Sequence, residues 1–322
     1  MTDVLVRADP LRDIPIPDHL DARAETDLAT ILAAHPTASP AVGWARWARL
    51  AAAAAAAAAL ILAFGFTHLR APSAAAAKVA LPVLTTTPFT MGTAPAARLT
   101  HLADLATGLP APGPTVRYRG WSLTARIDGK TVDTAIVTTD TELARQADGT
   151  AYKRVVVADV TYPTPESAAA WASDPAARVG QVVSDNPTAA LVYAGLAPTD
   201  PSALRAYLAV GHPIDSYGSG ELFVAITDLA QEQPFDGPTT AALLRVVAAA
   251  PGVTALGTVT DRAGRPGEAF AVDGTFTGLP TRWVLVVDPT TGRLLASESW
   301  LTTSAGQLGI QVPACIDYRT FG

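Results

Sequence analysis

The stretch VRYRGWSLTARIDG, residues 116–129, predicts the first strand of the fold and the turn that ends it. From Trp121 onward, apolar and polar residues alternate, which is the pattern of a strand with one buried face. The pair Asp128-Gly129 then supplies two residues that tolerate positive φ, as a two-residue type I′ hairpin requires. We therefore expect a strand that ends at this pair and a returning strand over residues 131–145.

A second Asp-Gly pair follows the returning strand. Asp148-Gly149 leads into residues 151–162, which contain the consecutive valines 155–157. Pro163 ends this segment, because proline lacks the N–H that a sheet ladder needs. Together the three segments predict an antiparallel meander.

Helices are expected before the meander and after it. Apolar residues recur at helical spacing in five segments: 96–107, 166–171, 203–208, 221–231 and 239–250. Asp200-Pro201 offers a capping residue and a proline at the first helical position, which predicts the start of the third helix. Because each helix has an apolar face, a sheet is needed to cover it.

Four more strands complete the pattern, over residues 255–260, 267–272, 282–287 and 293–301. The loops 261–266 and 288–292 that separate them contain Gly and Pro, as turns do. The order is therefore a helix, three strands, a helical block and four strands. It predicts an α+β fold in which a curved antiparallel sheet of about seven strands packs around helices.

Upstream of this domain, residues 50–69 carry no formal charge. About twenty such residues can cross a bilayer as a helix, and Arg49 and Arg70 bracket the segment. We therefore expect one transmembrane helix over residues 46–70, with the N-terminus in the cytoplasm and the C-terminal domain on the other side of the cell membrane. Two alternatives stay open: a buried alanine-rich helix, and a cleaved secretory signal that ends near residues 74–77.

The predicted organisation has four parts: a cytoplasmic tail (1–45), the transmembrane helix (46–70), an Ala/Thr/Pro-rich linker (71–95) and an exported domain (96–322). Residues 18–34 of the tail predict a short amphipathic helix. Its apolar face consists of Leu20, Leu28, Ile31 and Leu32. One hypothesis is that this helix binds a cytoplasmic protein partner. The alternative is that it frays or lies on the bilayer surface.

Composition excludes several functional classes. The net charge of −6 provides no basic patch for nucleic acid. Cys315 is the only cysteine, so no intrachain disulfide can form, and the residue is either a small buried apolar group or an exposed thiol. The five histidines lack zinc-site spacing, and no nucleophile or phosphate-loop motif occurs. The sequence predicts no enzyme, no metal and no cofactor.

One loop is the candidate site. The densest polar cluster outside the tail consists of Asp261, Arg262, Gly264, Arg265 and Gly267. These residues either bind a ligand or close a wide hairpin, because glycine permits positive φ and Asp–Arg pairs form charge-assisted hydrogen bonds. A second turn, expected to be structural, contains Asp288, Gly292 and Arg293.

Both loops carry a resemblance to a known family. Residues 251–267 and 288–295 closely resemble an uncharacterised family of actinobacterial single-pass membrane proteins, and the resemblance covers most of the chain. Leu143 departs from the family pattern, which puts the register of its strand in doubt. The family is often encoded beside sigma factors of the extracytoplasmic-function class, so the resemblance implies a link to such a regulator.

The order of elements also resembles the half-barrel of periplasmic lipoprotein carriers and of the envelope-stress sensor that binds a membrane anti-sigma factor. This leaves two functional hypotheses. The first is a membrane-tethered sensor or regulator that engages a cytoplasmic partner such as a sigma factor. The second is an envelope carrier or scaffold that holds lipid or peptide against the concave apolar face of the sheet.

Overall fold

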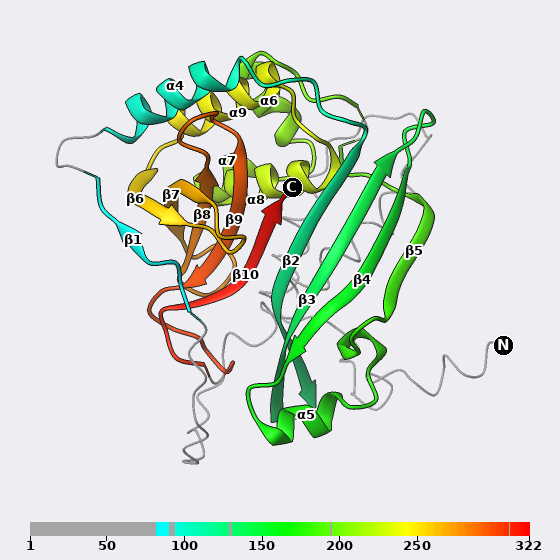
Figure 1. Ribbon diagram of the computed structural model, residues 1–322. Helices are drawn as coiled ribbons and strands as arrows, with labels where there is room; N and C mark the ends of the chain where they lie inside the picture. The colour runs from blue at the N-terminus through cyan, green and yellow to red at the C-terminus, as the bar shows by residue number, and fades with distance from the viewer. Residues whose placement is uncertain (1–81, 90–93, 129–130, 194, 309) are drawn as a thin grey trace, which may run out of the picture. The chain divides into compact units, whose positions relative to one another are not determined.

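The computed structural model describes residues 82–89, 94–128, 131–193, 195–308 and 310–322 (Figure 1). In these residues, ten strands form one antiparallel sheet in the order β1-β6-β7-β8-β9-β10-β2-β3-β4-β5. The strands are β1 (Thr86–Thr87), β2 (Thr115–Asp128), β3 (Thr131–Arg145), β4 (Ala151–Thr161), β5 (Val182–Ala189), β6 (Thr254–Thr260), β7 (Pro266–Gly274), β8 (Thr281–Val287), β9 (Leu294–Leu301) and β10 (Ala314–Phe321). Strand β10 pairs with both β9 and β2, so it joins the C-terminal strands to the meander.

The predicted meander of β2, β3 and β4 is confirmed. Strands β2 and β3 pair along their whole length, with Val116 opposite Leu143, which settles the register that Leu143 had put in doubt. Strand β4 returns along β3. One detail of the prediction is wrong: Asp128 pairs with Thr131 as part of the ladder, so it belongs to the strand and not to the turn.

All five predicted helices are present. The described helices are α4 (Pro95–Ala106), α5 (Pro165–Trp171), α6 (Pro201–Leu208), α7 (Ile214–Tyr217), α8 (Ser219–Glu232) and α9 (Gly237–Ala249), with a short 3-10 helix, η1 (Pro175–Ala177). Side chains of Thr164, Asp200 and Asp236 accept the N–H three residues on, which caps α5, α6 and α9. Helices α4, α6 and α9 pack together at one end of the sheet, and α8 lies against it (Figure 1).

The central strands of the sheet are buried on both faces. On one face, Phe270 of β7 and Leu285 of β8 pack with Phe223 of α8 in the main core. On the other face, Val284 of β8 packs with Trp300 of β9 in a second cluster. A strand covered on both sides has no need of alternation, which explains why β8 reads TRWVLVV.

The expected count of about seven strands is wrong, because β1, β5 and β10 escaped the sequence analysis. Strand β1 has only two residues, and β5 reads VVSDNPTA, a polar segment with a proline. Strand β10 reads ACIDYRTF, in which Asp and Arg interrupt the apolar pattern. Their neighbours in the sheet supply the pairing that local propensity does not, so the fold is richer in sheet than predicted.

The predicted membrane arrangement is also corrected. None of the described helices is long and apolar enough to cross a membrane. The longest, α8, has 14 residues, or about 21 Å, against a hydrocarbon core of about 30 Å. The described residues therefore do not support the single-pass architecture or the location at the cell membrane that was inferred from it. The expected span, residues 46–70, and the tail residues Leu20, Leu28, Ile31 and Leu32 lie outside the described residues. The four domain boundaries stay predictions.

Candidate functional site

A groove of about 480 Å³ opens over β2, β3, β4 and β10, beside the loop between β6 and β7. It lies on the face opposite α8: Arg319 of β10 donates to Gln231 of α8, so its neighbour Tyr318 points to the other side. Five arginines and two carboxylates line the groove: Arg117, Arg119, Arg154, Arg262 and Arg265, with Asp140 and Glu142. We refer to it as the arginine groove.

The loop at the rim of the groove takes its shape from Asp261. Its Oδ1 accepts hydrogen bonds from the backbone N–H groups of Ala263 (2.9 Å) and Arg265 (2.8 Å). Gly264 has φ of +80°, a conformation that suits glycine. Arg265 donates from Nε to Asp261 Oδ2 (2.8 Å) and from both Nη atoms to backbone carbonyls of β9 and β10. These side chains therefore tie the hairpin to the end of the sheet, and a ligand role for them stays a prediction.

Arg262 is held at the rim by a buried partner. Its Nε and Nη2 donate to the two carboxylate oxygens of Glu298 at 2.9 and 3.0 Å, and Nη2 also reaches the carbonyl of Pro82. The Glu298 side chain is fully buried and also accepts from Nε1 of Trp300 at 2.6 Å. Burial lowers the pKa of Arg262, but the hydrogen bond to Glu298 and its charge outweigh burial and raise that pKa. Arg262 is therefore a charged group in a fixed position.

Aromatic rings form the floor beside Arg262. Its guanidinium carbon lies 5.4 Å from the centre of the Tyr318 ring. Tyr318 in turn stacks on Trp121, with 5.4 Å between ring centres and 14° between planes. Burial raises the pKa of Tyr318, so its hydroxyl stays protonated at neutral pH. The floor combines a flat apolar surface with one hydroxyl.

The opposite wall of the groove carries exposed ion pairs. Arg119 donates from Nε and Nη2 to the carboxylate of Asp140 at 2.7 and 2.9 Å, and Arg117 contacts Glu142 at 3.1 Å. About half or more of each of these four side chains is exposed. Arg154 is also exposed and lies opposite Glu142 in the β3–β4 register. Exposed pairs contribute about 0–1 kcal/mol each, so their carboxylates can be exchanged at little cost.

The other predicted site residues lie elsewhere or have structural contacts. Gly267 lies in β7, where an added Cβ would collide with the side chain of Val286. Asp288 accepts N–H bonds from the turn that follows it, and Gly292, with φ of +70°, lies directly against the backbone of α4. Arg293 lines a different cavity of about 270 Å³. The structure therefore does not bring this turn to the arginine groove.

Sequence reasoning missed the wall of the groove, although part of its signal was present. Arg117 and Arg119 alternate on one predicted strand, and Asp140 and Glu142 alternate on the next. A turn at Asp128-Gly129 would have put Arg117 opposite Asp140. The observed ladder puts Arg117 opposite Glu142 and Arg119 opposite Asp140. A shift of the turn by one residue therefore changes which arginine faces which carboxylate.

A second polar cluster that the sequence analysis missed surrounds His212. Its Nδ1 lies 2.7 Å from Glu221 Oε1, and its Nε2 lies 3.3 Å from Asp228 Oδ2. Burial lowers the pKa of His212, but the hydrogen bonds and charges of Asp228 and Glu221 outweigh it and raise the pKa to about 9. The ring is therefore a buried cation at neutral pH. Glu221 and Asp228 come from one face of α8, about two turns apart, which only the folded helix reveals.

Cys315 is fully buried in β10 and contacts the carbonyl of Asp317 at 3.4 Å. Burial raises the pKa of its thiol well above the ordinary value. Of the two alternatives for this residue, the structure therefore favours the small buried apolar group.

The space between α8 and the sheet is nearly filled. A cavity of about 110 Å³ lies there, and its lining includes Asp228, Gln231, Asp317 and Arg319. Small-molecule sites are usually about 300–1,000 Å³ and mostly apolar. This cavity is smaller than that range, and its lining is mixed, whereas the sequence predicted a concave apolar face that could hold lipid or peptide.

No protein-family model and no curated protein matches the chain. Among solved structures, it is similar to MucB, with 15% identity and a TM-score of 0.24 over 71% of this chain and 58% of that chain. It is also similar to a chain in the complex of Pseudomonas aeruginosa MucA and MucB, with 14% identity and a TM-score of 0.24 over 71% and 56% of the two chains. This chain thus spans less than two thirds of the length of either, and TM-scores this low support no argument about function.

Proposed function

We propose that the described part of this chain is a non-catalytic binding module of a regulator, and that it takes an acidic polypeptide segment in the arginine groove. The observation that carries the proposal is the lining, five arginines against two carboxylates around about 480 Å³. This volume is within the usual range of ligand sites. With the buried partners Glu298 and Asp261 counted, five arginines meet four carboxylates. The remaining excess of one positive charge favours a partner of opposite sign and speeds its association.

The two sides of the groove suit this role in different ways. Arg262 and Arg265 pair with fully buried carboxylate side chains, so their positions are set before a ligand arrives. Arg117 and Arg119 pair with exposed carboxylates, and a ligand carboxylate can replace either one at little cost. The planar guanidinium can then bind the new carboxylate through two parallel hydrogen bonds.

The dimensions and the floor favour a peptide. The groove crosses four neighbouring strands, about 14 Å at the usual spacing of about 4.8 Å, which is the length of about four extended residues. Tyr318, which stacks on Trp121, adds an aromatic ring to the lining beside the arginines. Aromatic and arginine side chains are the types that dominate binding energy at protein interfaces.

Three groups that could act in catalysis are in unsuitable environments, which supports a non-catalytic role. Burial raises the pKa of both the Cys315 thiol and the Tyr318 hydroxyl, so neither is an activated nucleophile. Both ring nitrogens of His212 contact carboxylates. A general base needs a free nitrogen near neutral pH, which this histidine does not offer.

The finer proposal is that the regulator engages a sigma factor through residues 18–34. This part rests on the helical pattern of the tail and on the family resemblance alone. Affinity capture with the full chain and with a chain that lacks residues 1–36 tests it. A sigma factor retained only by the full chain supports the proposal, and equal retention by both chains contradicts it.

The carrier hypothesis has less support. The side of the sheet that α8 covers contains fully buried core residues such as Phe223 and Leu229. The cavity that is left there is only about 110 Å³, and its lining mixes polar and apolar side chains. An acyl chain would have to displace packed core, which costs several kcal/mol.

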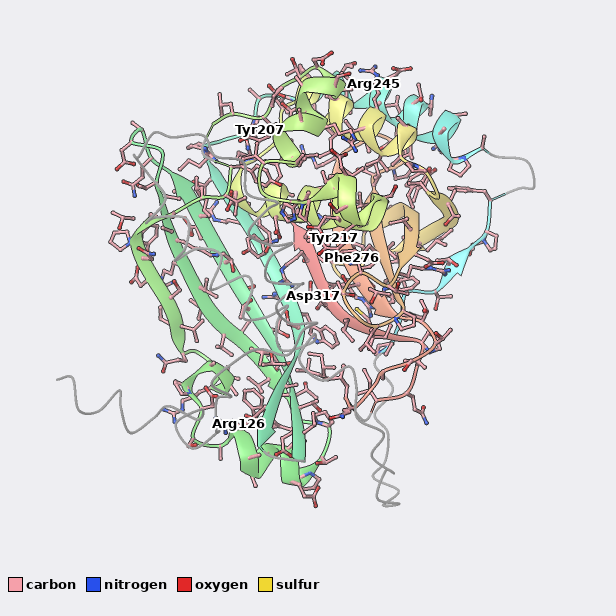
Figure 2. The ribbon with its side chains drawn as sticks, turned by 180° about the vertical axis from the view of Figure 1, so that it is seen from behind. Arg126, Tyr207, Tyr217, Arg245, Phe276 and Asp317 are labelled. Atoms are coloured by element: carbon pink, nitrogen blue, oxygen red, sulfur yellow. The ribbon has the colours of Figure 1, made fainter. Side chains whose placement is uncertain are left out.

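Fluorescence anisotropy of labelled hexaglutamate with the full chain tests binding in the groove. The double variant Arg119→Glu, Arg154→Glu should weaken binding at least about tenfold, because it reverses two charges on the wall. The control is Arg245→Glu, a charge reversal at a partly exposed arginine on α9 that pairs with Asp104 (Figure 2). An equal loss in the control, or equally tight binding of hexalysine, would contradict the proposal.

A further inference from the structure

A second surface, chemically different from the arginine groove, consists of three stacked aromatic rings. Tyr217 at the end of α7 stacks on Phe276, with 5.4 Å between ring centres and 19° between planes. Phe276 stacks on Trp283 of β8 at 4.7 Å and 20°. Figure 2 labels Tyr217 and Phe276 next to each other. We refer to these three residues as the aromatic stack.

The stack runs from the core to solvent. Trp283 is buried and Phe276 is half-buried, whereas Tyr217 is 53% exposed. Tyr217 is also the only aromatic residue among the large apolar side chains that the described structure exposes. One side of its ring is covered by Phe276, so the exposed part is a flat, rigidly supported aromatic surface.

The surrounding backbone is built to admit these rings. An added Cβ at Gly220 would lie 2.8 Å from both Phe276 and Trp283, and one at Gly274 would lie 3.1 Å from Trp283. Glycine at both positions therefore makes room for the stack. Gly218, with φ of +74°, separates α7 from α8 immediately after Tyr217.

Polar groups border the aromatic surface. The open cavity beside the stack has a volume of about 520 Å³ and is lined in part by Ser216, Asp273 and Thr275. Asp273 holds Arg282 through two hydrogen bonds of 2.7 and 2.8 Å, and 60% of the Asp273 side chain is exposed. Alternation along β7 and β8 places this pair on the face of the sheet opposite Trp283. The exposed hydroxyls of Ser216 and Thr275 are therefore the polar groups at the edge of the Tyr217 ring.

An aromatic surface with polar groups at its edge is complementary to a sugar ring. A pyranose presents an apolar face of C–H groups and a rim of hydroxyls that both donate and accept hydrogen bonds. From the structure we infer that the aromatic stack is a saccharide-binding site. A pyranose C–H face lies against Tyr217, and its hydroxyls reach the exposed hydroxyls of Ser216 and Thr275.

A proline-rich peptide fits the site less well. Aromatic grooves that bind such peptides combine parallel rings with donors for the peptide carbonyls. Here the indole of Trp283 lies under Phe276 and is only 5% exposed, so it cannot serve as that donor. The polar groups at the rim instead match many hydroxyls on a compact ring.

Isothermal titration calorimetry of the full chain with cellotriose, chitotriose, maltotriose and mannotriose tests this inference. At least one trisaccharide should bind, and Tyr217→Ala should weaken it about tenfold by removing the ring. The matched variant Tyr217→Phe keeps the ring and should stay within about threefold of the parent. Circular dichroism of both variants verifies that they fold.

Three outcomes would overturn the inference. The first is no binding of any of the four sugars at millimolar concentration. The second is sugar binding that Tyr217→Ala leaves unchanged. The third is binding of a ten-residue polyproline peptide at Tyr217 in place of every sugar, which would assign the surface to peptides. None of these outcomes bears on hexaglutamate binding, so the arginine groove is tested separately.

Discussion

The central strands β7, β8 and β9 and the groove strands β2, β3 and β4 belong to one sheet but have different surroundings. All but one of the residues of β8 are buried, whereas those of β4 are mostly half-buried or exposed. Helices cover one face of the central strands and a second apolar cluster covers the other. The groove strands leave one face open, and that face holds exchangeable ion pairs. The buried core therefore belongs to the central strands, and the proposed binding surface belongs to the groove strands.

The largest contrast is expected for apolar truncations. Phe270→Ala in β7 removes a fully buried ring and should lower the free energy of unfolding by about 4 kcal/mol. Val156→Ala in β4, at the half-buried lining of the groove, should cost about 1 kcal/mol or less. Urea unfolding followed by circular dichroism measures both. Equal losses would mean that the groove strands carry as much of the core as the central strands do.

The next contrast is between a buried and an exposed carboxylate. Glu298→Gln removes the charge that Arg262 and Trp300 contact and should cost about 3 kcal/mol, because it leaves a mostly buried arginine without its counterion. Glu142→Gln breaks an exposed pair and should cost less than about 1 kcal/mol. The same unfolding experiment applies. If the two variants lose equal stability, the difference in burial has no energetic consequence.

A smaller effect should appear as a dependence on pH. The pKa of His212 is raised to about 9, above the ordinary value of 6.5, so its protonated form stabilises the fold. This contribution is fully present below about pH 6.5 and is lost as pH rises through about 9. We expect a loss of about 2 kcal/mol over this interval, less than the whole shift implies, because Asp228 is 42% exposed.

The variant His212→Gln is the control for this slope. It removes the titrating ring and should flatten the dependence of unfolding free energy on pH between 6.5 and 9. Glu221, Asp228 and the stacked Tyr193 face the ring and are unchanged in the variant. An unchanged slope in His212→Gln would assign the pH dependence to another group.

The smallest effect on stability should come from the groove itself. Arg119→Ala should lower the free energy of unfolding by less than about 1 kcal/mol, and the difference should shrink further in high salt. The same variant should clearly weaken hexaglutamate binding, since Arg119 offers a fork of donors to a carboxylate. A large loss of stability without a change in binding would contradict the proposal that the groove strands serve binding and the central strands serve stability.

Much of the fold could be predicted because its signals are local. The capped helices α6 and α9 and the alternation in β2 follow from neighbouring residues. Two of the three missed strands depend on distant partners: β1 pairs with β6, and β10 is inserted between β9 and β2, which are far apart in the sequence. Local sequence patterns cannot predict that insertion.

The candidate site shows the same limit. The loop of Asp261 and Arg265 was visible as a polar cluster, because its contacts lie within four residues. The partner of Arg262 is Glu298, 36 residues later, and only the fold brings them together. The aromatic stack likewise joins α7 to β8 across 66 residues from Tyr217 to Trp283, so no sequence window contains it.

Strand β5 has a consequence for how molecules of this protein meet. It is the last strand of the sheet, and such a strand offers unpaired backbone groups to any chain that arrives. Pro187 has no N–H to donate there, and Asp185 adds a charge. A second copy that tried to extend the ladder would meet a missing donor and a repelling carboxylate. The β5 edge of the sheet should therefore not extend into a second molecule, which limits aggregation through this edge at high concentration.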